Sequence, residues 1–172
     1  MKVIIMGCGR IGSTLASHLS VDRHDVCVLD RDPDSRDLLP AAFAGRFLVG
    51  NGYNRGLLVE RAGIDTADAF VAVTSGDNTN LVGARIAKEH YRVPEVIARI
   101  YDPRRAEFLS TDAPEWRTRM GGGPPVRLGN TTSPSERLEH AAVATLRHGG
   151  GLYAVPAPRM PSTDPVAATL RF

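Results

Sequence analysis

The sequence predicts an α/β fold built on a doubly wound parallel sheet, and two observations support this prediction. Short apolar runs rich in Val and Ile alternate with helical patterns up to about residue 110, which is typical of a parallel sheet with helices on both faces. The first run, 2–6, leads into a G-x-G-x-x-G sequence at 7–12, and the second run ends in an acid, Asp30. This order of strand, glycine loop, helix and acid-terminated strand is typical of the Rossmann-like form of such a sheet.

Five strands and four helices are expected in the first hundred residues. The strands are expected at 2–6, 25–30, 46–49, 69–74 and 96–101, and the helices between them at 10–20, 33–42, 55–62 and 78–91. Asp32 before Pro33 marks the start of the second helix, since a proline in the first turn loses no hydrogen bond there. Gly63 ends the third helix, and Pro94 prevents the fourth from continuing.

The composition changes beyond Leu109, where Gly, Pro, Ser and Thr become frequent. We expect a fifth helix over about 103–110, a short strand at 126–128 and a further helix over 134–148. This last helix is predicted because Ser133 and Glu136 form a capping box, and because the glycines at 149–151 end the helical pattern. A Rossmann-like domain is therefore expected over 1–148, with an irregular tail over 149–172.

The bulk composition is that of an ordinary globular domain, with 42% hydrophobic and 23% charged residues. The net charge of +2, without a long Lys/Arg cluster, argues against nucleic acid as a partner. No apolar run approaches the roughly 20 residues that a membrane span needs, so no direct membrane insertion is expected. Cys8 and Cys27 lack metal-ligand spacing, and we expect no metal site and a cytoplasmic protein with two reduced thiols.

Each residue type in the glycine loop has a mechanical role. Gly7 allows a sharp turn, Gly9 lets phosphates approach the backbone, and Gly12 lets the helix lie close to the strand. The unpaired amides at the helix N-terminus favour a phosphate group. Asp30 can accept hydrogen bonds from the ribose hydroxyls of an adenine nucleotide. A bound adenine nucleotide is the first interpretation, and a Rossmann-like fold with an empty site is the alternative.

Further candidate residues follow the third, fourth and fifth strands, because ligands of doubly wound sheets bind at the carboxyl ends of the strands. These candidates are the segments 50–54 and 74–78, and Arg99 within the fifth strand. Without further context, 50–54 reads as a turn, Asp77 as a helix cap and Arg99 as a solvated charge.

The segment 71–80, together with 49–52 before it and 97–100 after it, resembles the regulatory N-terminal domain of the bacterial Trk/Ktr potassium-uptake family. The resemblance runs in register from Met1 to about Pro103. It implies that 7–11 wrap a pyrophosphate and that Asp30 holds the ribose. It also implies that 51–52 and 74–75 line the nucleotide, and that Arg99 reaches a phosphate or a neighbouring subunit. The complete set of predicted site residues is Gly7, Cys8, Gly9, Arg10, Ile11, Gly12, Asp30, Arg31, Asn51, Gly52, Thr74, Ser75, Asn78 and Arg99.

The resemblance also implies a ligand and partners. Members of this family bind NAD(H) or ATP/ADP, and the ligand decides how an assembled ring acts on a membrane potassium channel or transporter. Arg10 can pair with the terminal phosphates of ATP, or it can point into solvent. Arg31 beside Asp30 could suggest an NADP site, but the carboxylate would repel a 2′-phosphate. A cytosolic regulatory homo-oligomer is therefore expected.

The main alternative is a small NAD-dependent oxidoreductase, which would share the glycine loop. Hydride transfer usually needs a nearby proton donor. No Tyr-x-x-x-Lys sequence is present, and all five histidines read as surface or packing residues. An S-adenosylmethionine-dependent transferase fits the segment around Thr74 poorly. We therefore expect a regulator without catalytic residues.

One departure from the family pattern concerns the C-terminal part. Family chains usually continue into a second, smaller ligand-binding domain. The helix at 134–148 stands where the resemblance implies a crossover helix that packs on a partner subunit, and a helix that folds back on its own sheet is the alternative. Only residues 149–172 follow this helix, and they are too few for a second domain. We expect this second domain to be absent from the chain.

Overall fold

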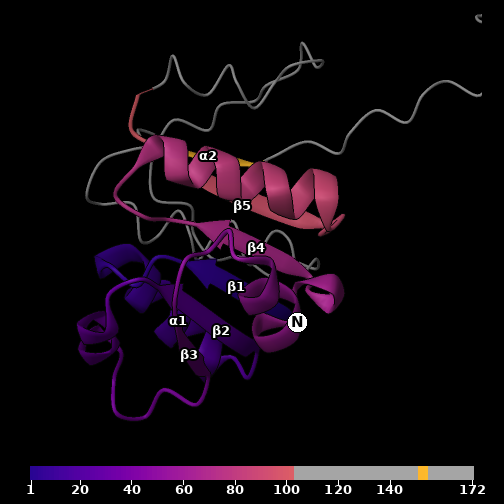
Figure 1. The fold of residues 1–172 in the computed structure, drawn as a ribbon. Coiled ribbons are helices and arrows are strands. Elements are labelled where there is room, and N and C mark those ends of the chain that lie inside the picture. Colours follow the sequence, from indigo (N-terminus) through magenta and orange to yellow (C-terminus); the bar gives the residue numbers. More distant parts are fainter. Residues whose placement is uncertain (103–150, 155–172) are drawn as a thin grey trace, which may run out of the picture.

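The computed structural model describes residues 1–102 and the backbone of 151–154. They form a six-stranded sheet in the order β3-β2-β1-β4-β5-β6 (Figure 1). Strands β1 to β5 pair in parallel, and β6 pairs antiparallel to β5. The bounds of the strands are β1 Lys2–Met6, β2 Asp25–Asp30, β3 Arg46–Val49, β4 Ala69–Ala72, β5 Glu95–Ile100 and β6 Gly151–Ala154.

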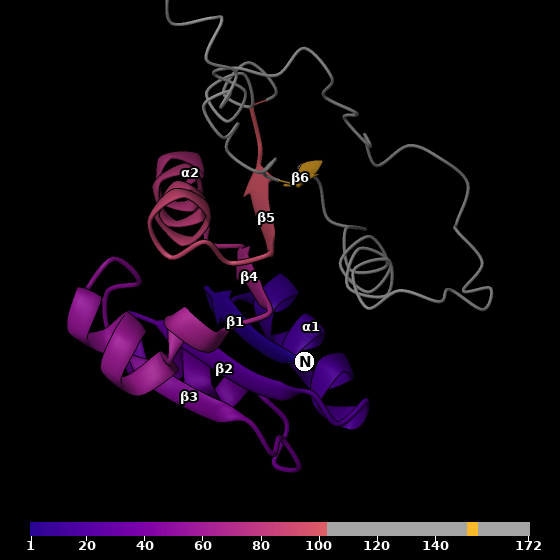
Figure 2. The same cartoon turned by 90° about the vertical axis from the view of Figure 1, so that its right-hand side faces the viewer.

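Helices cover both faces of the sheet, which confirms the doubly wound architecture. Figure 2 shows α1 on one side of the strands and α2 on the other. The helices are α1 Arg10–Val21, the 3₁₀ turns η1 Pro33–Leu38 and η3 Ile64–Thr66, the π-type helix η2 Leu57–Ala62, and α2 Asp77–Arg85, which continues into the π-type turn η4 Ile86–His90.

Alternation along the strands produces two hydrophobic cores, because successive side chains of a strand point to opposite faces. Ile4 and Met6 of β1 belong to the core beneath η2 and α2. Val3 and Ile5 of the same strand belong to the core beneath α1. Both sets are buried, as expected for a parallel sheet covered on both faces.

The chain reverses its direction across the sheet between β1 and β4. It winds outward from β1 through β2 to β3, and then returns to place β4 on the other side of β1. The carboxyl ends of β1 and β4 therefore form a topological switch point, which is where doubly wound folds bind ligands.

Two predicted elements differ from the structure for local reasons. The helix expected over 33–42 is only the 3₁₀ turn Pro33–Leu38, because Leu39 precedes Pro40 and adopts an extended conformation. The strand expected over 69–74 ends at Ala72. The Thr74 amide donates to the side chain of Asn80 (2.9 Å) instead of continuing the strand ladder.

The prediction of an irregular tail over 149–172 is wrong for 151–154, which form β6. These residues pair with Ile97–Ile100 of β5. The physical reason is that the outer edge of β5 carries backbone groups that need partners, and a contact between residues so far apart leaves no local signal. The predicted helix at 103–110, strand at 126–128 and crossover helix at 134–148 lie outside the described residues.

Candidate functional site

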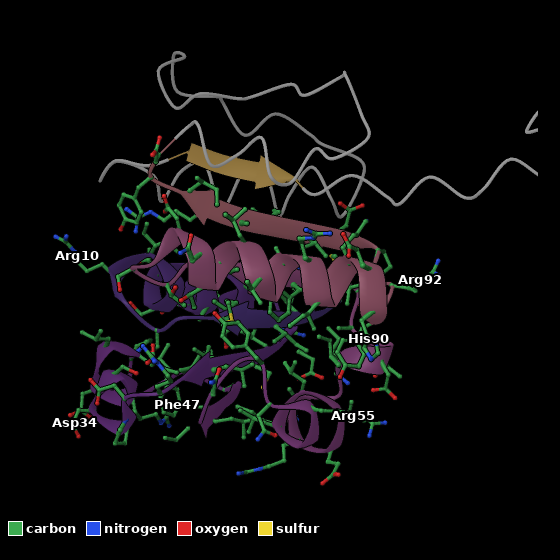
Figure 3. All side chains as sticks on the ribbon, turned by 45° about the horizontal axis from the view of Figure 1, so that its top comes forward. Arg10, Asp34, Phe47, Arg55, His90 and Arg92 are labelled. Carbon is green, nitrogen blue, oxygen red and sulfur yellow. The ribbon has the colours of Figure 1, made fainter. Side chains whose placement is uncertain are left out.

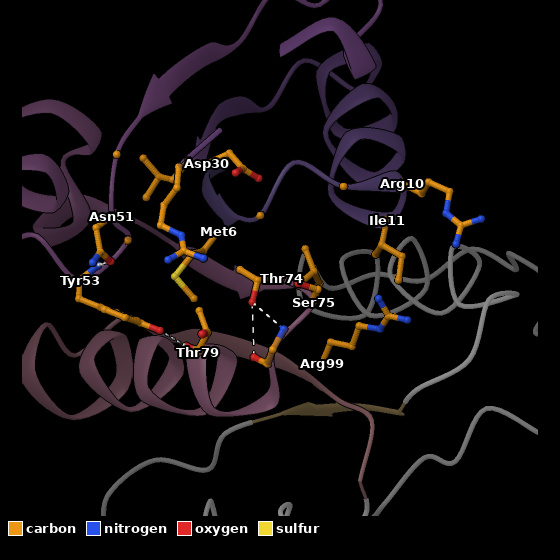
Figure 4. A pocket seen from close by; sticks show the side chains of 18 of the residues that line it. Met6, Arg10, Ile11, Asp30, Asn51, Tyr53, Thr74, Ser75, Thr79 and Arg99 are labelled. Atoms are coloured by element: carbon orange, nitrogen blue, oxygen red, sulfur yellow. Dashed lines mark hydrogen bonds between the residues drawn. The ribbon is translucent and has the colours of Figure 1, made fainter. Parts of the chain in front are cut away.

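A cleft of about 600 Å³ opens at the switch point of the sheet (Figure 4). Its walls come from the glycine loop after β1, the ends of β2 and β5, and the loops that follow β3 and β4. The residues that line it are Met6, Gly7, Gly9, Arg10, Ile11, Leu29, Asp30, Arg31, Gly50, Asn51, Gly52, Tyr53, Val73, Thr74, Ser75, Gly76, Thr79, Arg99 and Tyr101.

The glycine loop has the conformation that its sequence predicts. Gly7 has a φ of +109°, which side chains rarely adopt, and a Cβ there would lie 2.8 Å from the Thr74 nitrogen. A Cβ on Gly12 would lie 1.8 Å from the Gly7 carbonyl oxygen, so this glycine lets α1 pack against the loop. A Cβ on Gly9 would meet no atom within 4 Å. Gly9 therefore borders open space in the cleft, at the N-terminus of α1.

Asp30 links the end of β2 to the glycine loop. Its Oδ2 accepts a hydrogen bond from the Cys8 amide (2.6 Å), and its Oδ1 accepts one from the Asp32 amide (3.0 Å). A carboxylate has about four acceptor positions, so the half-buried Asp30 keeps acceptor capacity toward the cleft. Its backbone carbonyl accepts from the Gly50 amide (2.7 Å), which places the loop after β3 beside it.

The loop after β3 closes the cleft on the side of Asn51 and Tyr53. Gly52 is buried, and a Cβ on it would lie 2.3 Å from the sulfur of Met6. The Tyr53 hydroxyl donates to the Thr79 carbonyl on α2 (3.0 Å), and the Tyr53 amide donates to Asn51 Oδ1 (3.1 Å). These contacts give the loop a defined shape against α2.

Two arginines lie at the other end of the cleft. In Figure 4, Arg10 extends from the start of α1 and Arg99 from β5, away from Asn51 and Tyr53. Arg10 is exposed, whereas Arg99 is only 7% exposed and its guanidinium lies 3.9 Å from the ring centroid of Tyr101. The reading of Arg99 as a solvated charge is therefore wrong, and the cleft has a positive end suited to anionic groups.

Most predicted site residues come together in this cleft. The exceptions are Cys8, Gly12 and Asn78, which do not line it. The Cys8 side chain is buried and its Sγ donates to the Ser35 carbonyl (3.2 Å), and burial raises the pKa of this thiol to about 11. Asn78 is exposed on α2. The eleven that do line the cleft are Gly7, Gly9, Arg10, Ile11, Asp30, Arg31, Asn51, Gly52, Thr74, Ser75 and Arg99.

Sequence reasoning did not select several lining residues. Thr79 lies one position after the predicted Asn78, and Tyr101 lies two positions after the predicted Arg99. Both reach the cleft through the packing of α2 and β5. Gly50 and Tyr53 lie in a segment that the sequence indicated, but they carry no motif of their own. The apolar members Met6, Leu29 and Val73 could have been found from their positions at strand ends.

The described residues bring no histidine or lysine side chain to the cleft. His18, His24 and His90 do not line it, and His90 lies far from Arg10 in Figure 3. The proton of Tyr53 is engaged with the Thr79 carbonyl. Within 1–102 and 151–154, no group of three or more His, Cys, Asp or Glu side chains could hold a metal ion. Over the same residues, no helix has the length and apolar character needed to cross a membrane.

The fold, the glycine loop and the cleft at the switch point define a Rossmann-like domain of the nucleotide-binding kind. Residues 3–113 match the model of the TrkA-N domain. The chain belongs to the TrkA-N domain family, which confirms the resemblance to potassium-uptake proteins that the sequence indicated.

The curated relatives that the chain matches carry names from potassium uptake. The chain is 53% identical over 107 residues to the Trk system potassium uptake protein TrkA of Streptomyces coelicolor, covering 62% of this chain and 48% of that protein. It is 34% identical over 113 residues to the protein of the same name from Mycobacterium tuberculosis, covering 66% and 50%. The chain thus spans about half the length of these relatives.

Among solved structures, the chain resembles the Kef CTD of Shewanella denitrificans in an AMP-bound form. The TM-score is 0.50 at 28% sequence identity, covering 60% of this chain and 62% of that one. This likeness supports the Rossmann-like assignment of the described sheet.

Proposed function

We propose that this chain is the nucleotide-sensing part of a cytoplasmic regulator of a potassium channel or transporter, and that it binds NAD(H) or ATP/ADP. The observation that carries the proposal is the combination of open space beside Gly9, the α1 N-terminus and the acceptor Asp30 in one cleft. The names of the Trk relatives support the potassium system.

The adenosine half of the ligand would lie between Asp30 and the loops after β3 and β4. The two oxygens of Asp30 accept hydrogen bonds from the Cys8 and Asp32 amides, which fixes the orientation of the carboxylate. The remaining acceptor positions can take the ribose hydroxyls. The similar Kef structure is an AMP-bound form, which supports an adenine nucleotide as the ligand class.

The phosphates would lie over the glycine loop at the positive end of the cleft. The α1 amides favour a pyrophosphate beside Gly9, which both ligand classes contain. Arg10 and Arg99 can pair with a terminal phosphate of ATP or ADP. An NAD(H) ligand would instead extend its second nucleoside past these side chains. Direct binding measurements separate the two classes.

Regulation requires partners, and we propose two. The first is a further copy of the chain, because a ligand can change the geometry between paired subunits. The second is a membrane potassium channel or transporter subunit, whose opening would follow that geometry.

A small NAD-dependent oxidoreductase is the alternative, since it would share the glycine loop. It is disfavoured because the lining residues that the structure describes include no histidine or lysine, and because the Tyr53 hydroxyl donates to the Thr79 carbonyl. Steady oxidation of NADH with a small carbonyl or acid substrate would overturn the regulator and support this alternative.

Nucleotide binding is tested with a thermal-shift panel of NAD⁺, NADH, ATP, ADP and S-adenosylmethionine, followed by calorimetry. A ligand of the native state at 100 times its Kd adds about 2.7 kcal/mol to the free energy of unfolding. We expect stabilisation by NAD(H) or by ATP/ADP. No stabilisation by either class, or stabilisation by S-adenosylmethionine alone, would refute the proposal.

The position of the site is tested with Asp30→Ala. Loss of a charged hydrogen-bond acceptor costs about 1.5–3 kcal/mol, so the Kd should rise roughly 10- to 100-fold. Asp34→Ala is the matched control, because Asp34 is an exposed acid on η1 that does not line the cleft. An unchanged Kd for Asp30→Ala in calorimetry would show that the site is elsewhere.

A further inference from the structure

Asn80 is a buried polar residue behind the cleft that the proposed function does not use. It lies on α2, does not line the cleft and has an exposed fraction of 0%. A fully buried amide is unfavourable unless its hydrogen bonds are made. Its partners therefore indicate why an asparagine stands there.

The Asn80 side chain makes all four hydrogen bonds that an amide allows. Its Oδ1 accepts from the Thr74 amide (2.9 Å) and from the Thr74 hydroxyl (2.7 Å). Its Nδ2 donates to the Thr74 carbonyl (3.0 Å) and to the Arg99 carbonyl (2.9 Å). The orientation is determined, because a flipped amide would face an N–H with its NH₂ and two carbonyl oxygens with its own oxygen.

These bonds join two walls of the cleft. Thr74 begins the loop that presents Ser75 and Gly76 to the cleft, and Arg99 lies on the neighbouring strand β5. The Thr74 hydroxyl also accepts from the Gly76 amide (3.3 Å), so Asn80 supports the whole turn of that loop.

We propose that Asn80 is a positioning residue of the nucleotide site, which holds the loop after β4 and the end of β5 in the spacing that the ligand needs. The inference rests on the proposed nucleotide binding at this cleft. Asn80 acts through Thr74 and Arg99 and does not itself contact the ligand. Its removal would let the two walls move independently, and the ligand would have to order them on binding.

The test compares Asn80→Leu with Leu81→Ala. Leu has nearly the shape of Asn and removes all four hydrogen bonds, whereas Leu81 is a buried core residue on the same helix that does not line the cleft. Calorimetry with ADP and with NAD⁺ should give a Kd at least tenfold higher for Asn80→Leu. Leu81→Ala should lower the melting temperature and change the Kd less than twofold. Equal effects of the two variants on the Kd would overturn the inference.

A double-mutant cycle with Arg99→Ala separates positioning from a general loss of stability. If Asn80 places the β5 wall, Arg99→Ala should weaken ADP binding less in the Asn80→Leu background than in the wild type. Multiplicative fold-losses would overturn the inference. Asn80→Asp is the second variant, because it keeps the Thr74 acceptor and removes the donors, and it should also raise the Kd.

A measurement without ligand keeps the inference distinct from the proposed function. Amide hydrogen exchange at Thr74 should be at least tenfold faster in Asn80→Leu and unchanged in Leu81→Ala, and the carbonyl carbon shift of Arg99 should move only in the former. Unchanged exchange at Thr74 would overturn the role of Asn80. Failure of the wild type to bind ADP and NAD⁺ would instead overturn the proposed function.

Discussion

Gly9 and Gly12 of the same loop have opposite surroundings, in agreement with the separate roles that the motif gives them. The Cβ position of Gly9 is open to the cleft, whereas that of Gly12 is occupied by the Gly7 carbonyl. A methyl group on Gly9 would therefore occupy space that we propose for a ligand. A methyl group on Gly12 would instead overlap the backbone of the glycine loop. This contrast permits a test of the phosphate site that does not depend on removing a polar group.

Gly9→Ala should weaken nucleotide binding and leave the fold almost unchanged. The backbone at Gly9 has a φ of −72°, which alanine adopts, and loss of glycine at the N-cap costs at most about 1 kcal/mol. The added methyl would occupy the space of the phosphates, so calorimetry should show a Kd at least tenfold higher. Wild-type affinity in this variant would place the phosphates elsewhere.

Gly12→Ala serves as the comparison for that prediction. Its methyl group would overlap the Gly7 carbonyl oxygen, and such overpacking typically costs about 1–3 kcal/mol or more. Urea denaturation should therefore show a larger loss of stability than for Gly9→Ala. The reverse order of stabilities would contradict the packing described for α1.

At the scale of elements, α2 collects contacts from three cleft loops. Tyr53 reaches its Thr79 carbonyl, Asn80 holds the loop after β4, and the Asp77 carboxylate accepts from the segment after β5. A single turn of helix thus keeps the walls of the cleft in place. Asp77 does not cap its own helix, contrary to the simplest reading of the sequence, because its oxygens accept from Tyr101 (2.8 Å) and Asp102 (2.9 Å).

Asp77→Ala should destabilise the end of β5 and the whole domain. It removes the acceptor of two backbone amides and an acid from the first turn of α2, for which we expect a loss of about 2 kcal/mol. Asp77→Asn keeps one acceptor and should lose less. Urea denaturation measures both free energies of unfolding. Equal stabilities of the wild type and Asp77→Ala would show that these two bonds contribute nothing.

At the scale of the whole molecule, we expect at least a homodimer in solution. Control of a membrane partner by a nucleotide requires that the geometry between subunits can change, which a monomer cannot provide. The expected contact involves Leu138, Ala142 and Leu146 of the predicted crossover helix, which lies outside the described residues. Putting Asp at both Ala142 and Leu146 would bury charge in that contact, at a cost of several kcal/mol.

Light scattering at tens of micromolar tests this expectation. Dimers with an association free energy of about −6 to −7 kcal/mol still form in roughly this range. The wild type should scatter as a dimer or a larger species, and the double Asp variant as a monomer with the same fold by circular dichroism. A monomeric wild type would rule out a homodimer as the regulatory unit.

Local sequence alone determined the order of strands and helices up to about residue 100, the glycine loop and the acid that follows β2. These features depend on contacts within a few residues or on periodic burial, so they are visible in the chain. The same reasoning predicted the cleft-facing loops, because parallel strands end at a common edge. The predicted helix over 33–42 and the predicted strand over 69–74 are both shorter in the structure. Pro40 ends the first, and beyond the second the Asn80 side chain accepts the Thr74 amide.

Only the tertiary structure decided which polar side chains support the site. The bond from Asn80 to the Arg99 carbonyl spans 19 positions in the sequence, and that from Asp77 to the Asp102 amide spans 25. The pairing of β5 with β6 joins residues more distant still. Such contacts depend on how α2 and the strands pack, and a single sequence carries no periodic or local signal for them, because the energy that selects them arises only after the chain has folded.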